Sequence, residues 1–280
     1  MVVVLQKLIE IDEAFTHEGV FHADDVFASA LLRMLNPTIA ILRGNTVPEE
    51  FNGIIYDIGG GKYDHHQKQK LYRENGIPYA AFGLLWKEFG HLFLTDEDVI
   101  SFDQGFVQKI DLSDNTGEFD DLSQIISDFN PAWDDEISID ERFWEAVNFA
   151  QTILMNRIHK VLAERRAQKE VMKLMEEQEG LVLVMDRFYP WKDVVCGSDK
   201  LYVIFPSARG GYMIQAVPES SEAITLKKPF PMEWRGRKQN ELQEMTGIPT
   251  FTFCHMSGFI CAADTIADAE KIAQLAAGMS

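Results

Sequence analysis

The chain has 280 residues, of which 46% are hydrophobic, and its 44 Asp and Glu outnumber 26 Lys and Arg to give a net charge of −18. The 19 phenylalanines and 5 tryptophans provide enough core material to exclude global disorder. An acidic surface repels phosphate backbones, so extended coating of nucleic acid is also excluded. Clustered carboxylates instead favour the binding of metal ions.

The cysteines and the apolar segments favour a cytoplasmic protein. Cys196, Cys254 and Cys261 form no Cys-x-x-Cys pair, which argues against a disulfide framework and against a thiolate zinc site. The opening residues, MVVVLQKLIEIDEAF, lack the basic start of a signal peptide. No segment reaches the roughly 18 uninterrupted apolar residues that span a bilayer. We therefore expect a cytoplasmic protein with no membrane partner.

The first half of the chain alternates strand-like apolar runs with helical patterns. Apolar residues recur at helical spacing from Val26 to Met34, and Pro37 follows them. We expect strands over residues 8–15, 38–42 and 54–58, and helices over 24–35, 79–89 and parts of 96–109. This alternation predicts an α/β fold with a parallel sheet and helices on both faces. Catalytic groups then collect at the carboxyl ends of the strands.

A long helical connector follows. Ser138 and Glu141 fit a capping box, and from there to residue 178 the chain has neither Gly nor Pro. A helix of about 35 residues extends roughly 50 Å, which is too long for one small domain. We therefore expect a catalytic lobe over residues 1–137, a connector over 138–179 and a smaller α/β lobe over 180–280. In that last lobe we expect strands over 181–185, 201–205 and 250–253, and helices over 240–246 and 263–277.

Two short stretches carry the chemistry of a metal site. THEGVFHADD begins at Thr16, YDIGGGKYDHH begins at Tyr56, and together they hold four of the seven histidines. Each lies where an expected strand ends, so parallel strands would bring the two stretches together. Taken singly, each histidine is more often structural, and an Asp before a glycine run is often turn chemistry. Taken together, they favour a cation site, because burying so many ionisable groups without a cation is costly.

These residues also carry a family resemblance. Asp64-His65-His66 is similar to the signature of the DHH phosphoesterases, which include RecJ-type exonucleases and family II inorganic pyrophosphatases. THEGVFHADDVFASALL and YDIGGGKYDHHQ resemble more closely the melanocyte-proliferating-gene family of DHH-like metal-dependent exonucleases. Strings near the other end support this resemblance, which covers nearly the whole chain: IQAVP from Ile214, WRG from Trp234, TGIP from Thr246 and HMSGF from His255.

The resemblance implies a site for two manganese ions, with Mg, Co or Zn as alternatives. The implied metal ligands are His17, His22, Asp24, Asp57, His65 and Asp114. Asp57 would bridge the ions, and the metals would generate a hydroxide that attacks phosphorus. His66 would lie beside the scissile phosphate as an acid or an electrostatic stabiliser.

The resemblance leaves alternatives at some ligand positions and gives neighbouring aspartates other roles. Asp114 fits the family's fourth motif better than Asp111, which is the substitute. His22 stands where the superfamily usually has a carboxylate, which shifts the site toward nitrogen ligands. Asp64 and Asp25 are interpreted as groups that orient the ligands. For Asp25, a solvated helix N-terminus is an equal alternative.

In the second lobe, residues 227–238 read KKPFPMEWRGRK, a local excess of positive charge in an acidic chain. A solvated loop with ordinary turn glycines is the alternative to an anion site here. The resemblance favours substrate binding, and Trp234 would either stack on a base or belong to the core. The candidate substrate-binding residues are Arg209, Gly210, Gly211, Arg235, Arg237, His255 and Ser257.

The sequence and the resemblance together predict a metal-dependent phosphoesterase, a manganese-dependent exonuclease acting on RNA or short oligonucleotides. The expected partner is thus a short nucleic acid or a small phosphate ester. Three alternatives stay open: a pyrophosphatase-like hydrolase, a non-catalytic metal-dependent regulatory or binding protein, and a purely structural metal. The sequence predicts no oligomeric state.

Overall fold

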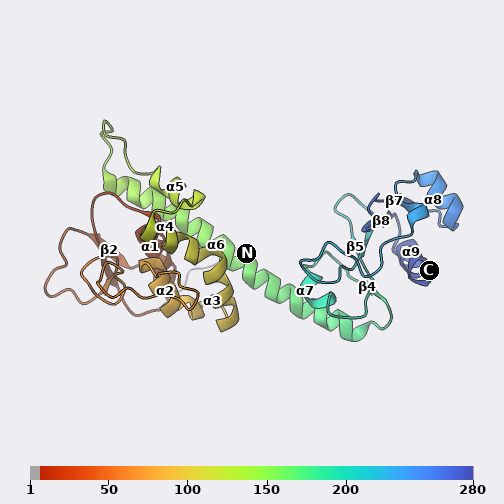
Figure 1. Cartoon of the computed structure of the whole chain (residues 1–280), viewed down its shortest axis with the longest axis horizontal. Helices are drawn as coiled ribbons and strands as arrows, with labels where there is room; N and C mark the ends of the chain where they lie inside the picture. Colours follow the sequence, from red (N-terminus) through yellow and green to blue (C-terminus); the bar gives the residue numbers. More distant parts are fainter. Residues whose placement is uncertain (1–6, 280) are drawn as a thin grey trace. The chain divides into compact units, whose positions relative to one another are not determined.

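The structure is a computed structural model that describes residues 7–279. Its contacts divide the chain into two compact units, Met1–Leu162 and Ala163–Ser280. Each unit contains its own sheet and its own helices, so the predicted α/β class is confirmed (Figure 1). Within residues 7–279, no helix combines the length and the hydrophobicity needed to cross a membrane.

The first unit contains a three-stranded parallel sheet. Strand β1 (Glu13–Thr16) lies between β2 (Ala40–Arg43) and β3 (Ile54–Ile55) and pairs with both in parallel. The predicted parallel arrangement is therefore confirmed, although the strands are shorter than the apolar runs. Because the strands run the same way, the segments that follow β1 and β3 leave the sheet at the same edge.

Helices surround this sheet and form most of the first unit. They are α1 (Ala23–Leu35), α2 (Ala81–Phe89), α3 (Asp96–Phe102), α4 (Gln108–Thr116) and α5 (Asp121–Ser127), with a 3₁₀ turn η1 (Gly90–Leu92) and a π-helical turn η2 (Asp103–Val107). Helix α1 packs against α2, α4 and α5, and all of its residues except Arg33 are buried. Phe27 of α1 contacts both Phe82 and Phe106, which joins α1 to α2 and η2.

A single helix, α6 (Ile139–Glu177), runs across the boundary between the units in sequence. It begins after Ser138, whose Oγ accepts a hydrogen bond from the N–H of Asp140 at 3.2 Å. Phe143 and Leu154 are buried in the core of the first unit, and Val171 is buried in a core of the second. One continuous helix thus contributes apolar residues to two separate cores.

The second unit contains a five-stranded mixed sheet in the order β4-β5-β6-β8-β7. Its strands are β4 (Val182–Val184), β5 (Tyr202–Pro206), β6 (Tyr212–Ala216), β7 (Phe251–Cys254) and β8 (Ile260–Ala263). Only the β4–β5 pair is parallel. The helices are α7 (Lys192–Val195), the 3₁₀ turn η3 (Met232–Trp234), α8 (Gln239–Thr246) and α9 (Ile266–Gly278).

The structure corrects one expectation for the second unit and decides between the two alternatives left open for Trp234. The helix expected over 263–277 begins only at Ile266, because Ala263 still belongs to β8 and the side chain of Thr265 caps the helix. Trp234 is 2% exposed and packs against Phe230 and Phe251, so it is a core residue with no free face for a base.

Candidate metal centre

The segment between β1 and α1 supplies the first part of the centre. His17 follows β1, and its Nδ1 is hydrogen-bonded to the carbonyl oxygen of Glu18 at 3.1 Å. Its Nε2 therefore faces the carboxylates, 3.2 Å from Oδ2 of Asp57 and 3.4 Å from Oδ2 of Asp25. Oδ1 of Asp25 accepts a hydrogen bond from the N–H of His22, which leaves Oδ2 directed at His17.

A tight turn after β3 supplies the second part. Asp57 has a φ of 57°, and it is the one non-glycine residue among residues 7–279 with positive φ. Asn and Asp tolerate this region better than other residues, and such strain is found preferentially at functional sites. The N–H of Asp57 donates to the carbonyl of Tyr63, so the chain folds back and carries His65 to Asp57.

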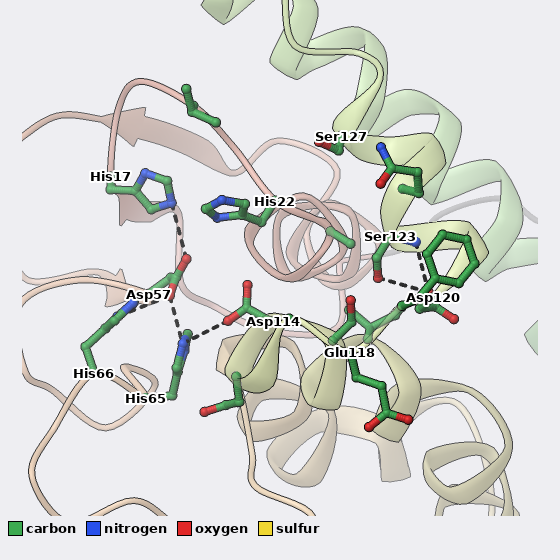
Figure 2. Close-up of a pocket in the computed structure, with 18 of the residues that line it drawn as sticks. His17, His22, Asp57, His65, His66, Asp114, Glu118, Asp120, Ser123 and Ser127 are labelled. Carbon is green, nitrogen blue, oxygen red and sulfur yellow. Dashed lines mark hydrogen bonds and ion pairs between the residues drawn. The ribbon is translucent and has the colours of Figure 1, made fainter.

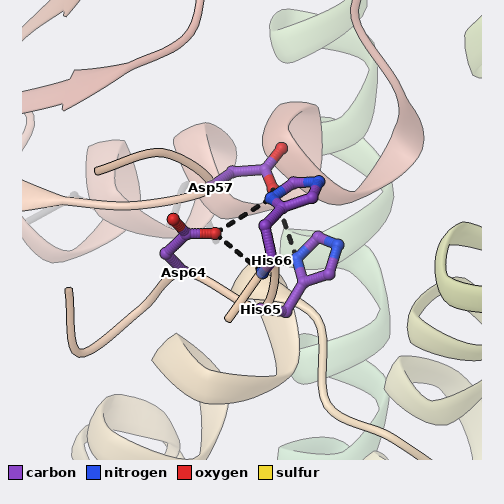
Figure 3. Close-up of side chains that lie close together, drawn as sticks. All are labelled: Asp57, Asp64, His65 and His66. Atoms are coloured by element: carbon purple, nitrogen blue, oxygen red, sulfur yellow. Dashed lines mark hydrogen bonds and ion pairs between the residues drawn. The ribbon is translucent and has the colours of Figure 1, made fainter. Parts of the chain in front are cut away.

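The two histidines after this turn have different surroundings. His65 is 7% exposed, and its Nδ1 lies 3.2 Å from Oδ1 of Asp57 (Figure 3). Its Nε2 lies 2.9 Å from Oδ2 of Asp114. The side chain of His66 is 63% exposed, and its Nδ1 is bonded to Oδ1 of Asp64 at 2.9 Å. Asp64 also accepts the backbone N–H groups of His66 and Gly60, and these bonds outweigh burial and lower the pKa of Asp64. Asp64 thus holds the ring of His66 in one orientation.

Asp24 lies beside His65 and also caps the N-terminus of helix α2. Its two oxygens accept the N–H groups of Ala81 and Phe82, while Oδ2 lies 3.8 Å from Nδ1 of His65. Asp24 is fully buried, and burial together with the nearby aspartates raises its pKa well above the usual range. Asp24 therefore combines a structural task with a position beside the candidate ligands.

The structure distinguishes between the two candidates for the last carboxylate. Asp114 faces His65, as Figure 2 shows, and both residues line a cleft in the first unit. Asp111, one turn earlier on α4, accepts the N–H of Gly83 and pairs with Arg73 at 2.7 Å. A Cβ atom on Gly83 would lie 1.8 Å from Oδ2 of Asp111, so only glycine leaves room for this carboxylate.

His22 lines the cleft but lies outside the groups of residues whose ligand atoms come close together. It precedes helix α1 and is exposed, and its ring centroid lies 6.4 Å from that of His17. Among the described residues, three groups bring potential ligand atoms within 4.8 Å of one another: His17/Asp25/Asp57, Asp24/His65/Asp114 and Asp57/Asp64/His65/His66. His22 is absent from all three, whereas Asp25 is present in one. The sequence had left Asp25 either as a group that orients the ligands or as a solvated helix N-terminus, and its complete burial excludes the second alternative.

The electrostatics indicate a centre that lacks positive charge. Burial raises the pKa of Asp25 to about 7. The hydrogen bond to Asp57 raises the pKa of His17 to about 9. For His65, burial lowers the pKa, but the neighbouring carboxylates of Asp114 and Asp57 outweigh it and the pKa rises overall. The raised pKa values reflect an excess of negative charge that a cation would offset.

Three buried atoms that make ion-pair contacts but no hydrogen bond support the fit of metal ions to these residues. Oδ2 of Asp25, Oδ1 of Asp57 and Nδ1 of His65 are buried, yet none has a hydrogen-bond partner among the described residues. Such atoms are rare in folded proteins, because an unsatisfied buried polar group is costly. Carboxylate oxygens and imidazole nitrogens suit Mn, Fe, Co or Zn. The donor set thus fits divalent cations, and it does not select one of them.

The candidate substrate-binding residues of the second unit form two groups. Arg235 donates two hydrogen bonds to the carbonyl of Phe230, and the nearby ring of His255 is bonded to Ser257. Arg237 is exposed and pairs loosely with Glu241. All of these residues lie near the start of β8.

The second group is the turn Arg209-Gly210-Gly211, which precedes β6 and lies at the opposite end of β8. Gly211 has a φ of 69°, and a Cβ there would lie 2.5 Å from the carbonyl of Ala263. Because Ala263 is the last residue of β8, the strand separates this turn from Arg235 and His255. The structure therefore does not bring all the predicted substrate residues to one place.

Comparisons with known proteins identify relatives along nearly the whole chain. The MYG1 protein C694.04c of Schizosaccharomyces pombe is 27% identical over 318 residues, covering 93% of this chain and 96% of that protein. The MYG1 exonuclease of Homo sapiens is 27% identical over 311 residues, covering 91% of this chain and 82% of that protein. The solved structure of RecJ in complex with Mg2+ from Thermus thermophilus is 11% identical, with a TM-score of 0.29, and covers 98% of this chain and 51% of that chain.

A family model identifies the chain. The model named MYG1_exonuc, described as an uncharacterised protein family (UPF0160), matches residues 13–277. This match spans nearly the whole sequence and confirms the resemblance carried by the two histidine-containing stretches. The chain belongs to the MYG1_exonuc family, UPF0160.

Proposed function

We propose that this chain is a metal-dependent phosphoesterase that removes nucleotides from the ends of short nucleic acids, with manganese as its metal. One observation carries the proposal: the triads His17/Asp25/Asp57 and Asp24/His65/Asp114 adjoin through the 3.2 Å contact between Asp57 and His65. Two adjoining clusters are the arrangement that a pair of cations needs. The name "MYG1 exonuclease", given to relatives from Homo sapiens and Rattus norvegicus, supports a nuclease.

The cleft above these clusters suits a substrate of nucleotide size. It has a volume of about 830 Å³ and is lined by residues of the first unit. Binding clefts for small molecules are typically about 300–1,000 Å³. The histidines lie at one end of the cleft with Asp57 and Asp114, and the hydroxyl groups of Ser123 and Ser127 lie at the other end with the carboxylates of Glu118 and Asp120.

Six residues would hold the metal ions, with His22 as a further nitrogen ligand from the rim: His17, Asp24, Asp25, Asp57, His65 and Asp114. When bound, divalent cations supply a hydroxide at neutral pH and offset charge on phosphoryl oxygens. His17 is oriented by the bond from its Nδ1 to Glu18, so Nε2 stays available as a ligand atom.

His66 is the group that would move a proton. Its Nδ1 is fixed by the Asp64 carboxylate, so Nε2 is the atom that would donate a proton to the leaving oxygen. Its exposure within the cleft gives a substrate access to that atom.

We further propose that the second unit contacts the substrate through Arg237, His255 and Ser257 at one end of β8 and through Arg209, Gly210 and Gly211 at the other. The Arg235 guanidinium would add charge while holding the segment through Phe230. The three buried cysteines, all free thiols, suit the cytoplasmic location that we expect.

A metal and substrate panel tests the proposal. Metal-free protein would be reloaded separately with Mn, Mg, Co and Zn and assayed on short RNA and DNA oligonucleotides and on inorganic pyrophosphate. We expect release of mononucleotides, fastest with manganese and abolished by a chelator. Hydrolysis of pyrophosphate alone would instead support a pyrophosphatase. No turnover with any metal would support a metal-dependent binding protein, and unfolding on chelation would support a structural metal.

A further inference from the structure

The cleft of the candidate metal centre has a second end that the chemistry at the metals does not use. This end is formed by the loop between α4 and α5 and by α5 itself. Ser123 and Ser127 of α5 lie across the cleft from His17 and Asp57 (Figure 2). A substrate whose phosphate lies at the histidines would therefore extend its remaining part toward α5.

An exposed aromatic side chain stands at this end. Phe119 lines the cleft and is 74% exposed, and Val20, which is 61% exposed, lines it from the segment between β1 and α1. A single exposed apolar residue is ordinary, but here two of them border the same cleft beside the candidate metal centre. Phe119 therefore offers an apolar face to a group that binds at this end of the cleft.

The charges at this end disfavour a phosphate there. Glu118 and Asp120 flank Phe119 and line the cleft. Lys70 is the only Lys or Arg among the residues lining the cleft, and it is engaged with Asn115 at 2.9 Å. A group that binds near Phe119 should therefore carry no negative charge.

Polar groups beside Phe119 suit the edge of such a group. Ser123, Gln124 and Ser127 line the cleft with two hydroxyls and one amide, which both donate and accept hydrogen bonds. The Ser123 hydroxyl is held by the carboxylate of Asp120 at 2.9 Å, so its position is fixed. An uncharged flat ring with polar atoms at its edge is a nucleobase.

We infer that Phe119 is the stacking platform for the base of the terminal nucleotide, with the polar side chains of α5 at the edge of that base. This inference rests on the proposed function, since it places the phosphate at the metal centre. Stacking tolerates any base, because every base has a π face. The acidic flanks of Phe119 would repel a continuing backbone, so the substrate class is a single-stranded end or a very short oligonucleotide.

Paired ligands isolate the contribution of the base. Adenosine 5′-monophosphate and ribose 5-phosphate carry the same phosphate and sugar, and only the first has a base. Their affinities for manganese-loaded protein would be measured by isothermal titration calorimetry for the unaltered chain, Phe119→Ala and Phe119→Trp. Trp133→Ala is the matched control, since Trp133 is 96% exposed in the same unit and does not line the cleft.

We expect the unaltered chain to bind adenosine 5′-monophosphate about tenfold more tightly than ribose 5-phosphate, in line with base–aromatic stacking. Phe119→Ala should remove this ratio without changing the affinity for ribose 5-phosphate, whereas Phe119→Trp and Trp133→Ala should keep it. An unchanged ratio in Phe119→Ala, or no binding of the nucleotide, would overturn the inference.

Hydrolysis of a short oligonucleotide by the same preparations separates this inference from the proposed function. Base-dependent binding without hydrolysis would leave the base site standing and overturn the proposed function. Hydrolysis with a ratio that Phe119→Ala does not change would overturn the base site alone.

Discussion

The ring of His65 meets Asp114 across the candidate metal centre, with Nε2 2.9 Å from Oδ2. This contact joins the turn after β3 to helix α4, two segments that lie far apart in the sequence. Asp111 is one turn earlier on the same helix, and it pairs instead with Arg73 and the N-terminus of α2. Two aspartates three residues apart therefore have different tasks, and their substitution should have different consequences.

Replacing Asp114 should impair metal binding and leave the fold intact. Asp114→Asn removes a ligand charge that faces His65, so we expect manganese affinity to fall at least about tenfold and hydrolysis to fall with it. The metal-free variant should be as stable as the unaltered chain, because the repulsion between Asp114 and Asp24 is relieved. Calorimetric titration with manganese and urea unfolding of the metal-free proteins measure the two effects. Full manganese affinity in this variant would remove Asp114 from the ligand set.

Replacing Asp111 should have the opposite profile. Asp111→Ala leaves the Arg73 guanidinium, which is 8% exposed, with Asp103 as its one remaining carboxylate and deprives Gly83 of its acceptor. Breaking a buried pair from one side costs about 3 kcal/mol in the free energy of unfolding. Arg73→Met should cost a similar amount, and the double variant should cost less than the sum. Additive losses in urea unfolding would show that the two residues act independently.

The fold of the first unit could be predicted because its signals are local. The apolar periodicity from Val26 to Met34 is that of a buried helix, and α1 follows it closely. Strands β6 and β8 were not predicted, because their apolar runs are short and are bordered by glycines and polar residues. Their pairing also depends on segments that are distant in the sequence. Helix α5 was not predicted either, because only Ile126 of its seven residues is buried and the helix therefore has little apolar periodicity.

The candidate site could be predicted only in part from the sequence. His17, Asp57 and His65 occur in dense histidine and aspartate motifs at strand ends, which parallel pairing brings together. The proximity of Asp25 to His17 depends on how the segment before α1 folds back, and no spacing rule shows that. Phe119 has no sequence signal of its own, because an exposed Phe and a core Phe look alike until the cleft is known.

Substitutions of the adjacent histidines should separate metal binding from proton transfer. His65→Ala should abolish both manganese binding and hydrolysis, because the ring contacts Asp57 and Asp114. His66→Ala should keep manganese bound, since its side chain is 63% exposed, but should lower kcat about 100-fold by removing a general acid. Metal content and the pH profile of kcat are the measurements. Equal loss of metal in both variants would make His66 a ligand and not an acid.

An arginine of the second unit should affect substrate affinity without affecting chemistry. Arg237 is exposed and held only by Glu241 at 3.5 Å and the carbonyl of Glu233 at 3.2 Å. Arg237→Ala should raise KM for an oligonucleotide about fivefold with kcat unchanged, as expected for one exposed phosphate contact of about 1 kcal/mol. Arg187→Ala, which removes another exposed arginine of the same unit, is the control. A similar rise in KM for both variants would indicate a general effect of charge.

Metal affinity should rise with pH, because protons and metal ions compete for the same atoms. Metal ions bind only after His17, whose pKa is raised to about 9, and Asp25, whose pKa is raised to about 7, have lost their protons. Below pH 7 both protons must be displaced, between pH 7 and 9 only that of His17, and above pH 9 neither. The apparent affinity should therefore rise at least about tenfold per pH unit between 7 and 9, with any proton released by His65 or Asp24 adding to the slope, and more steeply below 7. Calorimetric titrations in buffers of different ionisation enthalpy count the protons released.

His17→Gln should flatten the dependence between pH 7 and 9, while His91→Ala, which replaces an exposed histidine outside the cleft, should leave it unchanged. A flat pH profile in the unaltered chain would mean that the metal displaces no proton from His17 and that His17 is not a ligand.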